Sequence, residues 1–106
     1  MAKKYDEGKL PYHLLPMECV DELVKVLGMG AVKYGENSWQ WLDKFDDRYF
    51  AACMRHLSAW RQGEETDPES GLSHLTHALC NVTFLLAHEI YQKKGRENDI
   101  PCKKPS

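Results

Sequence analysis

Apolar residues recur at helical spacing in three separate segments of the chain. In the first segment, Val20, Leu23, Val24 and Leu27 follow one another at three- and four-residue intervals, which is the spacing of one helix face. Pro16 precedes them and suits a first helical turn. The pattern predicts a helix near residues 16–34, ending between two glycines, Gly28 and Gly35.

The second pattern predicts a helix over residues 46–62. Asp46 or Asp47 would be its N-cap and Gly63 its C′ residue, since these types are favoured there. One stripe of this segment is formed by Tyr49, Phe50, Cys53, Leu57 and Trp60. Arg48 and Arg55 fall on the opposite side and are bordered by alanines, an arrangement that leaves space for a ligand to approach.

The third pattern predicts a helix over residues 68–94, with Asp67 as N-cap, Pro68 in the first turn and Gly95 at the end, although Ser70-Gly71 could delay its regular part by one turn. Its apolar seam, which we expect to pack against the other helices, is Leu72, Leu75, Leu79, Val82 and Leu86. A second stripe lies on a different side, within an arc of about 60°, and consists of His74, His77, Asn81 and His88. This polar stripe either lines a site or contains ordinary surface and core histidines.

These patterns predict an all-α fold, a small bundle of three main helices, because no window alternates with the period of a half-buried strand. We expect one domain over residues 1–106, with an extended N-terminal arm over 1–14 and a polar tail over 96–106. Three helices make a thin core, so we also expect a homo-oligomer in which a second copy completes it.

Composition narrows the class of protein further. The 106 residues are 42% hydrophobic and 28% charged, with 14 Lys and Arg against 16 Asp and Glu and a net charge of −2. This balance excludes a disordered chain and a strongly basic protein that binds nucleic acid. The apolar runs are far shorter than the roughly 20 residues of a membrane span, and no secretory signal is recognisable, so we expect a cytoplasmic protein with reduced cysteines.

Several catalytic motifs are absent from the sequence. Gly30 and Gly35 are followed by Glu36 and Asn37 and not by the Gly-Lys-Ser/Thr of a phosphate-binding loop. The chain also lacks a His-Asp pair, a G-x-S-x-G motif, an H-E-x-x-H motif and the paired cysteines of a zinc finger.

The segment between the second and third patterns is unusually rich in titratable groups. It contains four carboxylates, Glu64, Glu65, Asp67 and Glu69, followed by His74 and His77. Carboxylate oxygens are the ligands preferred by Mg²⁺, and imidazole can add a ligand or move a proton. The segment therefore indicates a metal and polyphosphate site, unless these acids are solvated turn residues and Asp67 only caps a helix.

A complementary set of side chains could bind a nucleotide: Lys33, Tyr34, Asn37, Trp39, Arg48 and Arg55. Arginine binds phosphate through its planar guanidinium group, and aromatic rings stack on bases. The alternative is that the tryptophans are core residues, Trp60 most clearly, and that the arginines are surface charges.

An ordered series of short motifs extends through residues 4–86: Lys4-Tyr5-Asp6-Glu7-Gly8-Lys9, Leu14-Leu15-Pro16, Gly30-Ala31-Val32-Lys33-Tyr34-Gly35, Arg48-Tyr49, Arg55-His56, Gly63-Glu64, Glu69-Ser70-Gly71 and His77-Ala78. In this series the chain resembles the phage-encoded dATP/dGTP diphosphohydrolase family. That family is similar to the MazG-type all-α pyrophosphohydrolases. The resemblance implies metal-dependent hydrolysis of purine deoxynucleoside triphosphates to monophosphate and pyrophosphate, with Mg²⁺ or Mn²⁺ as the cofactor.

The resemblance also implies roles for residues. The metal would be held by Glu64, Asp67 and Glu69, and the catalytic residues would be His74 and His77. The substrate-binding residues would be Lys33, Tyr34, Asn37, Trp39, Arg48, Arg55, His56 and Asn81.

The chain departs from the MazG pattern at two positions. Ala78 and Asn81 stand where that pattern has glutamate and aspartate, so the second carboxylate pair is lost or is replaced by histidines. Glu18 with Asp21 or Glu22 could supply another acidic pair. The alternative function is therefore a nucleotide-binding or nucleotide-sequestering protein without catalysis.

Overall fold

The computed structural model describes residues 8–95. Its helices are η1 (Tyr12–Leu14, a 3₁₀ turn), α1 (Met17–Tyr34), η2 (Ser38–Trp41, also 3₁₀), α2 (Phe45–Arg61) and α3 (His74–Lys94). In this part of the chain the backbone forms no strand, only one isolated bridge between Thr66 and Ser73. The predicted all-α fold with three main helices is confirmed. The tail over 96–106 and the first seven residues of the arm lie outside the described residues.

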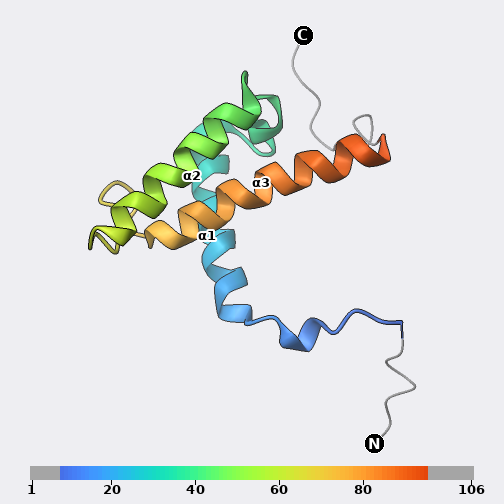
Figure 1. Ribbon diagram of the computed structural model, residues 1–106, viewed down its shortest axis with the longest axis horizontal. Coiled ribbons are helices and arrows are strands. Elements are labelled where there is room, and N and C mark those ends of the chain that lie inside the picture. The colour runs from blue at the N-terminus through green and yellow to red at the C-terminus, as the bar shows by residue number, and fades with distance from the viewer. Residues whose placement is uncertain (1–7, 96–106) are drawn as a thin grey trace, which may run out of the picture.

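The three long helices meet at α3. In Figure 1, α2 and α3 run obliquely to each other and α1 passes behind α3, in agreement with contacts of α3 to both neighbours. Residues 8–15 lead away from these helices (Figure 1), and the side chains of Leu10, Tyr12 and Leu14 are largely exposed. The body of the protein is therefore built by α1, α2, α3 and the loops between them.

An aromatic cluster joins the start of α2 to the middle of α3. The indole of Trp39 stacks on the ring of Phe84 with 4.4 Å between the ring centroids, and Tyr49 meets Phe84 edge-on at 5.1 Å. The Tyr49 hydroxyl donates a hydrogen bond of 3.1 Å to the Trp39 carbonyl. Burial raises the pKa of Tyr49 to about 12, so this hydroxyl keeps its proton and its bond at neutral pH.

The start of α2 differs slightly from the expected one. The helix begins at Phe45, with Lys44 as its N-cap in the left-handed region at a φ of 55°. Asp46 and Asp47 lie inside the first turn, where their charges still suit the positive end of the helix. The expected N-cap at either aspartate is therefore wrong, because the buried ring of Phe45 anchors the first turn.

The start of α3 is the larger correction, since the helix begins at His74 and not at Pro68. Ser73 is the N-cap, and its hydroxyl accepts a hydrogen bond from the amide of Leu75. Asp67 instead accepts a bond from the amide of Ser70, which closes a local turn. Gly71 follows with a φ of 76°, a conformation that interrupts any helix and suits glycine.

The expected apolar seam of α3 also faces the other way. Leu75, Leu79, Val82 and Leu86 are 42–53% exposed, whereas His74, Ala78 and Asn81 are buried. The reason is that α2 packs on the polar stripe. The expectation that the leucine seam packs against the other helices is therefore wrong within the described chain.

None of the helices in the described part of the chain combines the length and the apolar composition that a membrane crossing requires.

Candidate functional site

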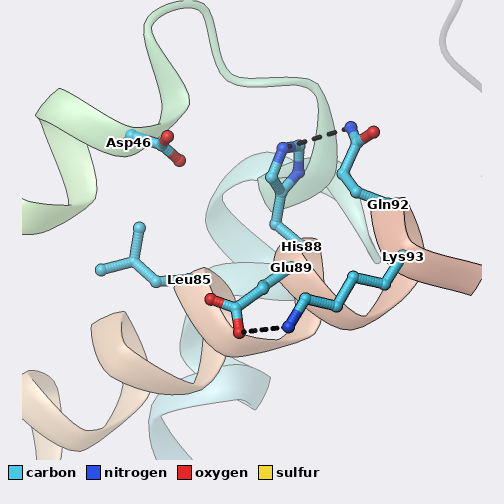
Figure 2. A pocket seen from close by; sticks show the side chains of 6 residues that line it. All are labelled: Asp46, Leu85, His88, Glu89, Gln92 and Lys93. Carbon is cyan, nitrogen blue, oxygen red and sulfur yellow. Dashed lines mark hydrogen bonds and ion pairs between the residues drawn. The ribbon is translucent and has the colours of Figure 1, made fainter.

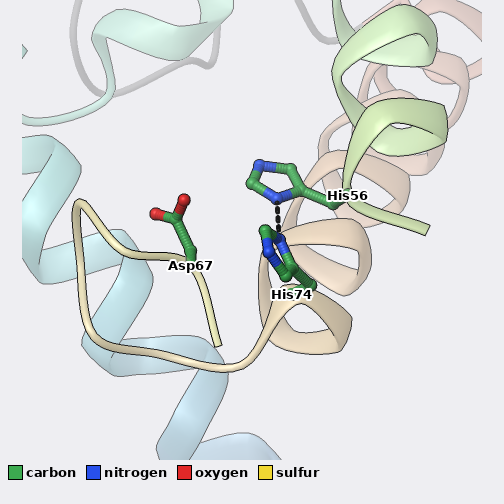
Figure 3. A group of neighbouring side chains, drawn as sticks. All are labelled: His56, Asp67 and His74. Carbon is green, nitrogen blue, oxygen red and sulfur yellow. Dashed lines mark hydrogen bonds between the residues drawn. The ribbon is translucent and has the colours of Figure 1, made fainter. Parts of the chain in front are cut away.

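Three histidines come together where the end of α2 meets the start of α3. The ring of His56 stacks on that of His77, with 4.6 Å between centroids and an angle of 11°. Nδ1 of His56 also lies 2.9 Å from Nδ1 of His74. Figure 3 marks this contact with a dashed line. His74 and His77, the two predicted catalytic residues, therefore both contact His56, a predicted substrate-binding residue.

Two carboxylates border these rings. Oε1 of Glu64 lies 2.7 Å from Nε2 of His74 and accepts its hydrogen. Oδ2 of Asp67 lies 3.5 Å from Nε2 of His77. Glu64 and Asp67, both predicted site residues, therefore contact two different histidines of the cluster.

The loop over residues 62–73 brings these groups together. It turns back on itself through hydrogen bonds from the amide of Asp67 to the carbonyl of Leu72 and from the amide of His74 to the carbonyl of Glu65. Gly63, with a φ of 105°, ends α2 and starts this return. The loop thereby places Asp67 opposite the first turn of α3.

Ser70 belongs to the same network, although the sequence analysis gave it no role. Its Oγ lies 2.6 Å from Nε2 of His77 and accepts a hydrogen bond from the amide of Leu72. The signal in the sequence was its spacing, three residues after Asp67 and seven before His77. Because Asp67 and Ser70 both approach the same ring nitrogen, the arrangement is not a Ser-His-Asp triad, in which the acid binds the other nitrogen.

Burial and mutual repulsion set the charge of the cluster. Burial lowers the pKa of His56, and the adjacent His77 and His74 lower it further. Burial likewise lowers the pKa of His77, more than the nearby Asp67 raises it. Burial alone would raise the pKa of Asp67, but hydrogen bonds from Ser70 and the neighbouring imidazoles outweigh it, so this pKa is lowered. At neutral pH the site thus holds the ionised carboxylate of Asp67 beside the neutral rings of His56 and His77.

Glu69, the third predicted metal ligand, is not brought into this cluster. Its Oε2 lies 2.9 Å from Nζ of Lys33 at the end of α1, on the surface. The Lys33 ammonium also lies 5.2 Å from the centre of the Tyr34 ring, which is itself largely exposed. These three residues form a neighbouring charged and aromatic surface.

The other predicted substrate residues are spread over the molecule. Arg48 and Arg55 are exposed on α2, and Asn37 adopts a left-handed conformation with a φ of 62° before η2. Trp39 is packed in the aromatic cluster. Asn81 is buried, and its amide donates a hydrogen bond to the carbonyl of His77, one turn earlier.

Two further expectations concern residues outside the cluster. Trp60 was the clearest candidate for the core, but it is 41% exposed, so this expectation is wrong. On α1, Glu18 and Asp21 are exposed and Glu22 pairs with Lys25 at 2.6 Å.

A separate open hollow of about 570 Å³ lies between the start of α2 and the C-terminal half of α3. Figure 2 shows Leu85 and His88 on its α3 side and Asp46 on its α2 side. His88 is four helical turns from His74, about 21 Å at 1.5 Å per residue. The hollow is therefore not part of the histidine cluster.

The described residues thus define a class of all-α domain in which imidazoles and carboxylates gather at a helix junction. Within this class, the chain belongs to the family described as "dATP/dGTP diphosphohydrolase, N-terminal", which matches residues 1–98.

A curated relative supports the same assignment. The dATP/dGTP diphosphohydrolase of Salmonella phage PMBT28 is 34% identical over 82 residues, which are 77% of this chain. They are 28% of the relative, so the chain spans less than a third of that protein's length. No solved structure matches the chain.

Proposed function

We propose that this chain hydrolyses dATP and dGTP to the nucleoside monophosphate and pyrophosphate, with Mg²⁺ or Mn²⁺ as the cofactor. The observation that carries the proposal is the convergence of His56, His74, His77, Glu64 and Asp67 at one helix junction. Membership of the family and the name of the phage relative supply the substrate class.

The donor set bears on which of the two cations is used. Mg²⁺ prefers oxygen ligands, whereas imidazole nitrogen suits transition metals. Since imidazoles outnumber carboxylates in the cluster and Glu69 is paired with Lys33, the set fits Mn²⁺ better than Mg²⁺. A bound divalent cation would neutralise charge on the phosphate oxygens.

His77 is the residue that we propose to move a proton. Its lowered pKa leaves the ring neutral at pH 7, so Nε2 can accept a proton from the attacking water. The amide of Leu72 already donates to Ser70 Oγ, so the Ser70 hydroxyl can donate its own hydrogen to Nε2 of His77. This hydrogen bond would keep the His77 ring in position until the attacking water takes its place.

Charged and aromatic residues around the cluster would bind the substrate. Arg55 is next to His56 in sequence and exposed, and we assign it with Arg48 and Lys33 to the triphosphate. Tyr34 and Asn37, close to Lys33 along the chain, are assigned to the base. Trp39 would support this part of the site from the aromatic cluster.

The uncovered apolar face of α3 supports a homo-oligomer. Leu75, Leu79, Val82, Leu86 and Ile90 fall within an arc of about 80° at 100° per residue, and each is at least 38% exposed. We name these five residues the leucine stripe. A stripe that runs along a whole helix is self-complementary about a twofold axis, so we propose that a second copy of the chain covers it.

The test is an assay of pyrophosphate release from each of the four deoxynucleoside triphosphates with Mn²⁺ or Mg²⁺. We expect release from dATP and dGTP, and a loss of about 10- to 100-fold in Asp67→Asn. The amide oxygen of asparagine can still accept from Ser70, so the loop should remain folded. Asp43→Asn, an exposed carboxylate in the loop before α2, is the matched control.

A second candidate function is nucleotide binding without hydrolysis. It is favoured by Ala78 and Asn81, which leave the middle of α3 without a carboxylate; Asn81 is instead bonded to its own helix. Calorimetric binding of dATP or dGTP without pyrophosphate release would support it. Release that is equal in wild type and Asp67→Asn would contradict the proposed site.

A further inference from the structure

The side chains of His56, Asp67 and His74 offer ligand atoms to one point from three different segments. His56 comes from α2, Asp67 from the loop and His74 from the first turn of α3, and their ligand atoms all lie within 4.8 Å of one another. Figure 3 shows the two imidazoles facing each other with the Asp67 carboxylate beside them. The three positions are held by packing and backbone bonds of separate elements.

The hydrogen bonds determine which nitrogen atoms carry lone pairs. Because the Glu64 carboxylate only accepts, the hydrogen of His74 lies on Nε2, which leaves Nδ1 as the nitrogen with the lone pair. This lone pair points to Nδ1 of His56 at 2.9 Å. A neutral His56 donates there as one tautomer, and as the other tautomer, with its hydrogen on Nε2, it presents a second lone pair at the same place.

The distance between the two nitrogens suits a shared cation. Metal–imidazole bonds of about 2.0–2.1 Å place two nitrogens about 2.9 Å apart at octahedral angles and about 3.3–3.4 Å apart at tetrahedral angles. The observed separation of 2.9 Å matches the octahedral spacing.

Glu64 contacts the ring nitrogen of His74 that would not bind the metal, as a carboxylate commonly does next to a metal-binding histidine. Ligating histidines usually donate their other ring hydrogen to such a group, which fixes the tautomer and the ring orientation. Oε1 of Glu64 at 2.7 Å from Nε2 of His74 provides this contact. His74 is only 4% exposed, so its ring has little room to turn away.

We propose that His56, His74 and Asp67 bind one divalent transition-metal ion, such as Mn²⁺, Fe²⁺, Co²⁺ or Zn²⁺, in preference to Mg²⁺, with Glu64 orienting His74. Two nitrogens and one oxygen are a transition-metal donor set, whereas Mg²⁺ selects oxygen. The proposal rests on the proposed function, since it names the metal class of the same site. In it, neither Glu64 nor Glu69 is a metal ligand, because Glu64 binds His74 and Glu69 binds Lys33.

The test uses Co²⁺ as the probe, because its visible absorption responds to nitrogen ligands. The full chain is treated with EDTA, dialysed, and titrated with Co²⁺ by calorimetry and absorption. We expect saturable binding of one Co²⁺ per chain that an excess of Mg²⁺ does not displace. His56→Gln and Asp67→Asn should each weaken it by about tenfold or more.

Two controls separate this site from other histidines and from unfolding. His13→Ala removes an exposed histidine in η1 and should leave Co²⁺ affinity unchanged. Circular dichroism should show that both site variants keep their helix content. The absence of saturable binding, displacement by equimolar Mg²⁺, or equal losses in His13→Ala and His56→Gln would each overturn the proposal.

The metal site and the proposed hydrolysis can fail separately. Tight Co²⁺ binding without pyrophosphate release under any metal would uphold the metal site and remove the proposed function. Mg²⁺-supported release of pyrophosphate that is undiminished in His56→Gln, with no Co²⁺ binding, would uphold the function and overturn the metal site.

Discussion

Nζ of Lys33, in the last turn of α1, lies 2.9 Å from Oε2 of Glu69, in the loop before α3, although the two residues are 36 positions apart. Both side chains are more than half exposed, and exposed ion pairs contribute little to stability. The ion pair therefore shows that the end of α1 lies next to the loop over residues 62–73, but it contributes little to the stability of this contact.

Replacing Lys33 should affect nucleotide binding more than folding. We expect Lys33→Met to weaken dATP binding by about five- to tenfold, because a charge-assisted bond to phosphate is lost, and to leave the melting temperature unchanged. Lys25→Met, which breaks another exposed pair on α1, is the matched control. Equal dATP affinity in the two variants, measured by calorimetry, would remove Lys33 from the site.

Glu69→Gln, in contrast to Lys33→Met, should not weaken nucleotide binding. Without the carboxylate, the Lys33 ammonium loses its partner at 2.9 Å and can turn to phosphate, so we expect dATP to bind equally well or more tightly. A loss of metal affinity in Glu69→Gln, measured by Co²⁺ titration, would instead return Glu69 to the metal ligands.

Trp39 should be a stability determinant. Trp39→Ala removes the ring stacked at 4.4 Å on Phe84, and we expect a loss of about 2–3 kcal/mol in the free energy of unfolding. Trp60→Ala removes an equally large but 41% exposed ring and should cost less. Urea denaturation measures both, and equal losses would contradict the structural role of Trp39.

Acidification should destabilise the metal-free protein through the histidines. The pKa of both His56 and His77 is lowered in the fold, so the unfolded chain binds more protons and stability rises with pH. The contribution is fully present above the ordinary value of 6.5 and is lost as the pH falls below it. In EDTA, the melting temperature of wild type should fall more between about pH 7.5 and about pH 5.5 than that of His56→Gln. Parallel curves for the two proteins would contradict this.

A charge in the leucine stripe should dissociate the proposed oligomer. We expect Val82→Lys to yield a monomer by light scattering, because an ammonium would be buried against the second copy. Val32→Lys places the same change on α1, where the side chain is 91% exposed, and should keep the assembly. A wild-type protein that is monomeric at tens of micromolar would end the proposal.

The sequence predicted helix bounds well where apolar periodicity and local capping signals decide them. The first two helices lie within a residue or so of their expected bounds. The start of the third was wrong because Asp67 and Pro68 resemble a helix start, while the long-range bonds of the loop decide its path. At residues 67–73, local sequence preference favoured the first turn of a helix, whereas the hydrogen bonds of the loop stabilise a non-helical turn.

The candidate site was predictable in part for a similar reason. His74 and His77 belong to one stripe, and Glu64 and Asp67 are close in sequence, so periodicity and composition identified them. His56 is on another helix, and only the resemblance named it, as a substrate-binding residue, because helix periodicity carries no information on its contact with His74. The inward face of α3 was misjudged because leucine is usually the buried type, whereas here the polar stripe meets α2.

Two different parts of the fold position the ligand atoms of the cluster: the packing of two helices and the path of the loop over residues 62–73. The spacing of His56 and His74 depends on how α2 and α3 pack, whereas the position of Asp67 depends on how the loop returns to Ser73. Insertions or deletions in the loop would therefore change the oxygen donor and keep the nitrogen pair.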